Sequence, residues 1–298
     1  MPSWESMLQA VAIIALAPLI QGFIQWCKAR LQSRRGPAPL QPYRNIFKLL
    51  AKDMVIAQTS SWLTTATPFI CFGAAFAVAG IIPVSNGASA GMADLFLVVY
   101  LYGASRFFMA LAGLDSGNSF AGMGSSREIY LAVLVEPVFL LAIVAAAGNA
   151  GATELGAMAR EATRHPFTLP YVLAALAFFF VVVAESGRIP VDNPDTHLEL
   201  TMFHEALLLE YSGRHLALLH WAAFIRQMAI ILLFVELFVP WSWMDLIPST
   251  FFWLMLKMTV VSILLAMVET STAKMRLFKL PNFLAASGLL SLLALVAR

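Results

Sequence analysis

The sequence predicts an all-α integral membrane protein, and three observations support that prediction. Hydrophobic residues make up 60% of the 298 residues and charged residues only 12%, against about 45–50% and about 25% in an ordinary soluble domain. The apolar residues gather into eight runs of roughly the length that a helix needs to cross a bilayer. No internal repeat or soluble module interrupts these runs, so residues 1–298 are predicted to form a single integral membrane domain.

The expected membrane spans follow one another along the whole chain. They cover about residues 6–27, 61–82, 93–112, 129–149, 167–185, 215–239, 249–271 and 281–297. Because the number of expected spans is even, both termini are predicted to lie on the same side of the membrane.

The basic residues predict which side that is, because cytoplasmic loops of membrane proteins retain positive charge. The connections after the first, third, fifth and seventh spans hold thirteen Lys and Arg residues, namely Lys28, Arg30, Arg34, Arg35, Arg44, Lys48, Lys52, Arg127, Arg188, Arg214, Lys274, Arg276 and Lys279. The opposite side holds Arg160, Arg164 and Arg298. Both termini are therefore expected on the outer side.

The first inner connection combines helix breakers with an amphipathic segment. The helix of the first span is broken by Gly36, Pro37 and Pro39. The next segment, QPYRNIFKLLAKD, has apolar and basic residues on opposite faces of a helix. Such a helix is expected to lie in the membrane interface. The candidate docking residues are Arg34, Arg35, Gln41, Tyr43, Arg44 and Lys48. Two interpretations stay open: a docking surface for a cytoplasmic partner, and a basic helix that contacts only lipid.

Several ionisable residues fall inside the expected spans, where a charge must be paired or line a wet cavity. They are Arg106, Glu136, Arg226, Glu236 and Lys257. Arg106 and Glu136 are each roughly 10 Å below the inner surface at ~1.5 Å per residue, so they are expected to pair if their helices are neighbours. Glu236 and Lys257 are able to meet by snorkelling, and Arg226 then needs another partner. A static ion pair and a proton relay are the alternative roles for these charges.

The acidic residues are concentrated in one connection. Six of the 17 fall within residues 185–210, between the fifth and sixth expected spans. Asn193 followed by Pro194 is typical of a helix start, so a short helix over about 194–210 is predicted. Glu185 and Arg188 are expected to lie within reach of each other. Neighbouring carboxylates raise one another's proton affinity, which suits groups that exchange protons; the alternative is a solvated loop whose acids offset nearby basic side chains.

Neither a metal nor a nucleic acid is indicated by the sequence. Cys27 and Cys71 fall in apolar segments without metal-ligand spacing. His197 and His204 are seven residues apart, unlike the two His of a zinc-binding HExxH helix. The formal charge of +2 is too small to favour nucleic-acid binding. We therefore expect no cofactor in this chain, and membrane neighbours as partners.

Four segments together resemble one protein family. They are RRGPAPLQPYRNIFKLL, SRFFMALAGLDSGNSFAGMGSSREIYLAVLVEP, ESGRIPVDNPDTHLELTMFHEALLLEYSG and ETSTAKMRLFKLPNFL. The chain looks like the membrane subunit shared by respiratory complex I, its subunit 1, and the group 4 membrane-bound nickel-iron hydrogenases, which include formate hydrogenlyase. Complex I members tend to carry ERxPFDxPEAExEL in the acidic loop. The segment VDNPDTHLELTMFHEALLLEYSG of this chain more closely resembles the hydrogenase branch.

The resemblance implies an eight-helix anchor for a peripheral arm in a prokaryotic cytoplasmic membrane. Iron-sulfur and large nickel-iron subunits would dock on the first inner connection and the acidic loop, antiporter-like subunits would adjoin in the membrane, and quinone is not expected. Redox cofactors would belong to the partners, so this chain alone would carry out no redox chemistry. By motif, the coupling residues would be Arg106, Glu136, Glu185, Arg188, Asp192, Asp195, Glu199, Glu205, Glu210 and Tyr211. A quinone-site subunit of complex I type and a purely structural anchor are the alternatives.

Overall fold

The computed structural model describes residues 4–57, 59–82, 94–164, 168–192, 203–239 and 250–297. Within these ranges the regular elements are helices, and the β-structure is limited to an isolated bridge between Asp94 and Glu154. The helices are α1 (Trp4–Leu31), α2 (Gln41–Leu50), α3 (Trp62–Ile81), α4 (Leu95–Asp115), α5 (Ser119–Ala150), α6 (Leu155–Arg164), α7 (Leu169–Glu185), α8 (His204–Leu208), α9 (Gly213–Phe238), α10 (Thr250–Ser271), η1 (Leu277–Lys279) and α11 (Leu280–Val296). The predicted all-α class is confirmed.

Seven segments of the described chain are long and apolar enough to cross a membrane. They lie in α1, α3, α4, α5, α9, α10 and the stretch from η1 through α11. The remaining expected span, about 167–185, corresponds to α7, which is apolar but has 17 residues. The chain is therefore a multi-pass membrane protein.

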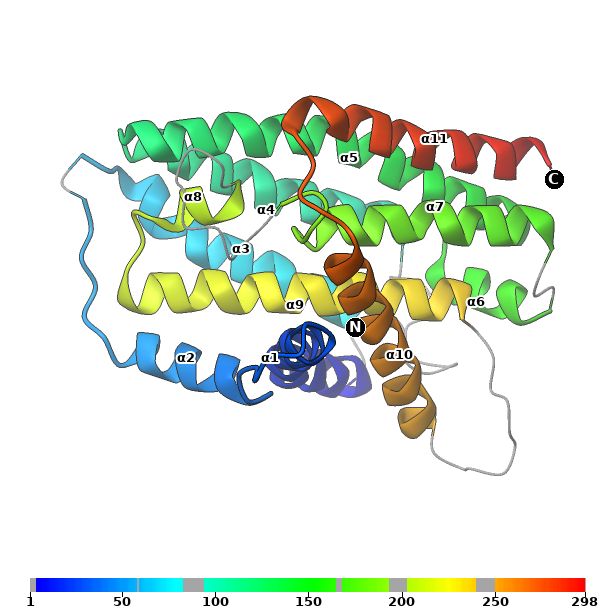
Figure 1. Ribbon diagram of the computed structural model, residues 1–298, viewed down its shortest axis with the longest axis horizontal. Coiled ribbons are helices and arrows are strands. Elements are labelled where there is room, and N and C mark those ends of the chain that lie inside the picture. Colours follow the sequence, from blue (N-terminus) through cyan, green and yellow to red (C-terminus); the bar gives the residue numbers. More distant parts are fainter. Residues whose placement is uncertain are drawn as a thin grey trace.

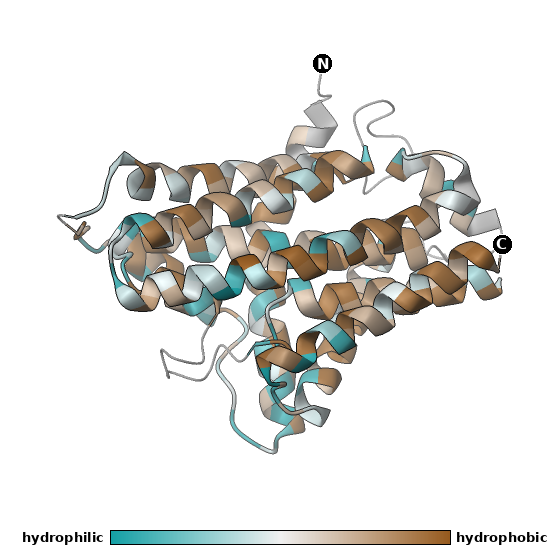
Figure 2. Cartoon of the chain, turned by 90° about the horizontal axis from the view of Figure 1, so that it is seen from above, coloured by the Kyte–Doolittle hydropathy of each residue, from teal (hydrophilic) through white to brown (hydrophobic). Residues whose placement is uncertain are grey.

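The long helices form a bundle in which α1 and α10 are inclined to the rest. Figure 1 shows α4, α5, α7, α9 and α11 running roughly side by side, with α1 seen nearly end-on and α10 crossing them steeply. α1 packs against α9 and α10, α3 against α4 and α9, and α5 against α4, α7 and α11. Figure 2 shows hydrophobic residues along most of the length of the long helices. That distribution is typical of helices that face lipid as well as one another.

Local sequence signals fix several helix ends. The side chains of Ser61, Asp94 and Asn118 accept hydrogen bonds from the backbone N–H two residues ahead, which starts α3, α4 and α5. Gly151 ends α5 at a φ of 63°, in the left-handed region that glycine adopts without strain.

The fourth expected span begins earlier than the sequence indicated. α5 starts at Ser119 and is 32 residues long, so the glycine- and serine-rich segment before residue 129 is helical. The Asn118 cap starts this helix, and packing against α4 and α8 compensates for the poor helix propensity of its glycines. As a result Arg127 and Glu128 lie on the helix and not in a loop. The short helix α6 was also not expected.

The helix expected over about 194–210 is shorter in its described part. Phe203 has non-helical dihedral angles, φ −102° and ψ −85°, and α8 covers only His204–Leu208. Residues 193–202, with Asp195, His197 and Glu199, lie outside the described residues. A single continuous helix through Phe203 is therefore not formed.

Candidate functional site

A buried ion cluster joins three helices inside the bundle. Arg106 of α4 lies 2.8 Å from Glu185 at the end of α7 and 3.7 Å from Glu128 of α5. All three side chains are more than nine-tenths buried. A buried charge is tolerated only when it is paired, and here one guanidinium is shared by two carboxylates. The cluster therefore holds an excess of carboxylate over cation among these residues.

The predicted pair between Arg106 and Glu136 is not formed. The partner of Arg106 is Glu185, because α7 packs against α5 and brings its last residue to this depth. Glu136 does lie against the same part of α4: a Cβ built on Gly103 would be 3.1 Å from its Oε1. Glu136 thus extends the cluster by one turn of α4 without an ion pair to Arg106.

The start of the acidic loop is bound to the end of α10. Arg188 Nη1 lies 2.8 Å from Glu269 Oε2, and Arg188 Nη2 donates to Gln21 Oε1 at 2.6 Å. Lys28 Nζ contacts the other carboxylate oxygen of Glu269 at 2.7 Å. The expected contact between Glu185 and Arg188 is therefore wrong: Glu185 turns to Arg106, and Arg188 turns to Glu269.

A second tie holds the same loop. Asp192 accepts from Lys274 Nζ at 2.9 Å and from the Phe203 backbone N–H at 3.2 Å. The backbone N–H of Met275 donates to Pro190 O at 2.8 Å. The two ends of the acidic loop are thereby fixed to each other and to the segment after α10.

Helix α8 packs closely against two glycines, Gly113 of α4 and Gly124 of α5. A Cβ on Gly113 would lie 2.5 Å from Leu207 Cδ2, and a Cβ on Gly124 would lie 2.9 Å from that of Ala206. α8 consequently packs directly on α4 and α5. His204 at its start is half-buried, and its buried Nε2 lacks a hydrogen-bond partner in the described structure. Desolvation of the imidazole, reinforced by the charge of Arg226, lowers its pKa to about 3. His204 is therefore neutral.

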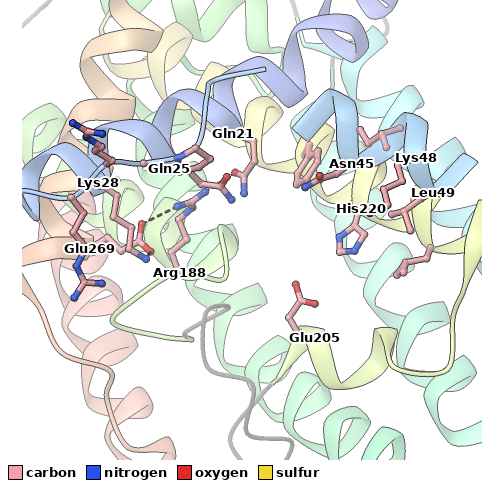
Figure 3. A pocket seen from close by; sticks show the side chains of 18 of the residues that line it. Gln21, Gln25, Lys28, Asn45, Lys48, Leu49, Arg188, Glu205, His220 and Glu269 are labelled. Atoms are coloured by element: carbon pink, nitrogen blue, oxygen red, sulfur yellow. Dashed lines mark hydrogen bonds and ion pairs between the residues drawn. The ribbon is translucent and has the colours of Figure 1, made fainter. Parts of the chain in front are cut away.

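Two cavities connect the loop to the ion cluster. The larger has a volume of about 760 Å³ and lies among α1, α2, α8 and α9 (Figure 3). The smaller, about 120 Å³, reaches Arg106, Glu128 and Glu185. Both are lined by Gln21, Arg188, Glu205, His220 and Phe224. The shared lining makes one polar route from the wide cavity to the buried cluster.

The other predicted loop residues occupy the edges of this route. Glu205 lines both cavities, and Figure 3 shows it projecting from α8 toward them. Glu210 accepts a hydrogen bond from the Asn118 side chain. Tyr211 is buried near Thr67 of α3, and burial raises its pKa. Only Glu205 of these three lines the route.

Of the remaining intramembrane charges, Arg226 lines the smaller cavity, whereas Glu236 and Lys257 line neither cavity. The backbone carbonyl of Arg226 accepts from Tyr102 Oη at 2.6 Å. Glu236 and Lys257 are near enough to interact electrostatically, but no ion pair of 4.0 Å or less joins them in the described structure. The direct contact that snorkelling would allow is not formed.

The candidate docking residues divide into two sets. Arg34, Arg35 and Lys48 line the large cavity. Gln41 donates to Asn45, Tyr43 donates to the backbone carbonyl of Ala15, and Arg44 is exposed. Arg44 is therefore the basic residue of α2 that points away from the cavity.

Sequence reasoning missed four residues that hold the loop in place and one, Glu128, that completes the Arg106 cluster. They are Gln21, Lys28, Glu128, Glu269 and Lys274. Glu269 carried a usable signal, since it is a lone carboxylate at the C-terminal end of an apolar run. In the described residues no group of three or more His, Cys, Asp or Glu side chains could hold a metal ion.

The fold and this route define a multi-pass membrane protein with a chain of ionisable side chains leading into its interior. A family model described as NADH dehydrogenase matches residues 5–297. The chain belongs to this family.

Two curated relatives come from Escherichia coli (strain K12). Formate hydrogenlyase subunit 4 is 35% identical over 280 residues, covering 91% of this chain and 90% of that protein. Hydrogenase-4 component C is 36% identical over 272 residues, covering 90% and 85%. A subunit of the NADH-quinone oxidoreductase of Paraburkholderia phymatum is 28% identical over 287 residues, covering 86% and 80%. The expected similarity to the hydrogenase branch is confirmed.

A solved structure supports the fold. A chain of the membrane-bound sulfane sulfur reductase, an archaeal respiratory membrane complex, superposes with a TM-score of 0.84 at 21% identity. The match covers 99% of this chain and 100% of that chain. The described bundle is thus a known membrane-complex fold.

Proposed function

We propose that this chain is the membrane anchor and coupling subunit of an energy-converting nickel-iron hydrogenase of the formate hydrogenlyase type. In that role it links electron transfer in a peripheral arm to the movement of protons or sodium ions. The identity to formate hydrogenlyase subunit 4 and hydrogenase-4 component C, 35% and 36% against 28% for the quinone oxidoreductase subunit, favours the hydrogenase partner. The observation that carries the coupling role is the polar route from the acidic loop to the Arg106 cluster.

The proposed membrane arrangement has eight spans, with α7 as the eighth and α2 in the inner interface. α2 buries Pro42 and Ile46 and exposes Arg44, Phe47 and Lys48, as expected of an interfacial helix. The excess of basic residues on the side of α2 supports an outer location for both termini in a prokaryotic cytoplasmic membrane.

The proposed partners sit on the inner face and beside the bundle. Iron-sulfur and large nickel-iron subunits would dock on the acidic loop and on the side of α2 that faces away from the large cavity, around Arg44. Antiporter-like subunits would adjoin in the membrane. In this arrangement the iron-sulfur clusters and the nickel-iron centre belong to the partners, and this chain holds no quinone.

The proposed relay runs from the loop carboxylates inward. Glu205 lines both cavities, neutral His204 lines the smaller one, and Glu185 and Glu128 share Arg106 at that cavity. Glu136 continues the series along α5. Asp195 and Glu199, which lie outside the described residues, are proposed as further proton acceptors.

The test is a Glu136→Gln variant in the assembled complex, reconstituted in vesicles. We expect normal assembly and hydrogen evolution with ion transport lowered by about 100-fold, the scale of a lost proton-transfer group. Glu154→Gln removes a carboxylate from the connection between α5 and α6, which takes no part in the Arg106 cluster; it is the matched control and should transport normally. Glu185→Gln tests the cluster itself, because Arg106 then loses its nearest carboxylate.

Each alternative has a distinct result. If Glu136→Gln and Glu185→Gln both retain assembly and ion transport, the relay role is rejected and the chain is a structural anchor. Quinone co-purifying in stoichiometric amount would favour the complex I type of subunit. Repeating the transport measurement with a sodium ionophore and with a protonophore identifies the ion.

A further inference from the structure

The large cavity is built from six separate parts of the chain: α1 with the turn after it, α2, the acidic loop, α8, α9 and α10. Gln21, Gln25 and Lys28 come from α1, and Arg34 and Arg35 from the turn that follows it. α2 supplies another wall and the first turns of α9 supply a third, while Arg188 and Glu269 lie on the side of α1 (Figure 3). Its volume of about 760 Å³ lies within the range of about 300–1,000 Å³ that is usual for ligand sites.

The charge of this cavity is strongly unbalanced. Its described lining holds six cations, Lys28, Arg34, Arg35, Lys48, Lys52 and Arg188, against the two carboxylates Glu205 and Glu269. Glu269 is already engaged by Lys28 and Arg188. Arg34, Arg35, Lys48 and Lys52 form no ion pair with another described residue. Converging cations of this kind concentrate anions, and the arginine fork suits phosphate oxygens.

Besides its charged residues, the cavity has an apolar side and the uncharged polar residues Gln21, Gln25, Gln32, Asn45 and His220. Ile46 and Leu49 of α2 face Leu216 and Phe224 of α9 across the cavity lining. Next to them Phe47 on α2 is 65% exposed, which leaves an apolar surface beside a basic one. A soluble anion matches only the basic wall, whereas a phospholipid matches both. The cavity also lies at the C-terminal end of α1 and beside the first turns of α9, two helices long and apolar enough to span a membrane, so we expect it near the depth of lipid head groups.

We propose that this cavity binds the phosphate head group of an anionic phospholipid, with Arg34, Arg35 and Lys48 contacting the phosphate and the acyl chains leaving along the apolar side of α2. Basic cavities between membrane helices on the cytoplasmic side are suited to such head groups. The lipid is a structural ligand that joins α1, α2 and α9. The outward residue Arg44 is left for a protein partner.

The test uses the full chain, purified in a neutral detergent and studied by native mass spectrometry and by titration with nanodiscs. The probes are phosphatidylglycerol, cardiolipin, phosphatidylcholine and inorganic phosphate. We expect retention of the two anionic lipids and little of the zwitterionic one. In Arg34→Gln/Arg35→Gln, binding of phosphatidylglycerol should weaken by about 10- to 30-fold, from about one kcal/mol per basic residue.

The matched control is Arg276→Gln/Lys279→Gln, which removes the same charge from exposed residues outside the cavity lining. It should bind phosphatidylglycerol as the unaltered chain does, and Lys48→Gln provides a single-site check if the double variant unfolds. An equal loss of phosphatidylglycerol binding in the control would show that lipid binding depends on general surface charge and not on this cavity. Inorganic phosphate binding as well as phosphatidylglycerol would make the site a free-anion site. An acidic segment of a partner filling the cavity in the assembled complex, with no lipid retained, would also overturn the proposal.

Discussion

Arg188 Nη1 lies 2.8 Å from Glu269 Oε2, although 81 positions separate the two residues in the chain. Lys28 binds the other oxygen of the same carboxylate. One buried side chain at the C-terminal end of α10 thus holds α1 and the first turn of the acidic loop together. The cavities described above depend on this junction, since Arg188 lines both of them.

Glu269→Gln should strongly destabilise the protein. The substitution keeps the shape but leaves two cations without their shared carboxylate, and breaking a buried ion pair costs about 3–5 kcal/mol. Thermal unfolding in detergent measures the loss. Asp53→Asn, at an exposed carboxylate, should change stability by less than about 0.5 kcal/mol. Equal effects of the two substitutions would disprove the role assigned to Glu269.

Gly124→Ala should displace α8, because the new Cβ would lie 2.9 Å from that of Ala206. We expect a net destabilisation of about 1–3 kcal/mol from overpacking. Gly122→Ala, two residues earlier on α5, has no atom within 4 Å of the new Cβ and should be neutral or slightly stabilising. Hydrogen exchange of residues 204–208 distinguishes displacement of α8 from a global effect. Unchanged exchange in Gly124→Ala would contradict the packing argument.

His204 should make stability fall at acidic pH. Its pKa is about 3 in the folded chain because its imidazole is desolvated, and about 6.5 when unfolded. Between these values only the unfolded state takes up the proton, so stability is complete above about pH 6.5 and declines as the pH falls toward 3. From pH 7 to pH 5 the unaltered chain should lose about 2 kcal/mol more than His204→Gln. Identical pH profiles would show that His204 is protonated in the folded state as readily as in the unfolded one.

Tyr102→Phe should cost about 1–1.5 kcal/mol, since the hydroxyl donates to the Arg226 carbonyl at 2.6 Å inside the bundle. Tyr100→Phe on the same helix removes a hydroxyl from a side chain that is 67% exposed and should be nearly neutral. Denaturation of both variants in the same detergent gives the difference. A larger loss in Tyr100→Phe would place the important hydroxyl on the other face of α4.

The apolar runs were sufficient to predict most of the fold. Each membrane helix is coded by its own contiguous segment, so composition and length locate it without knowledge of its neighbours. α5 was misplaced at its start because the glycines and serines after Asn118 have poor helix propensity, and packing with α4 and α8 offsets that weakness.

The ion pairs were not predictable in the same way. Depth along a helix places Arg106 and Glu136 at one level, but the pairing depends on which helix lies next to α4 and how it is rotated. Glu185 reaches Arg106 because α7 ends there. Glu269 belongs with Lys28 and Arg188 only through the crossing of α10 with α1, which no local pattern encodes.

The contact between Lys28 and Glu269 also sets an order of events during synthesis. Lys28 is made at the end of the first helix, and the carboxylate that it binds follows 241 positions later. At about 5–20 residues per second, the ribosome needs roughly 12–48 s to supply it. The junction of α1, α10 and the acidic loop therefore forms only after Glu269 has been synthesised. It is a late contact in the folding of the nascent chain.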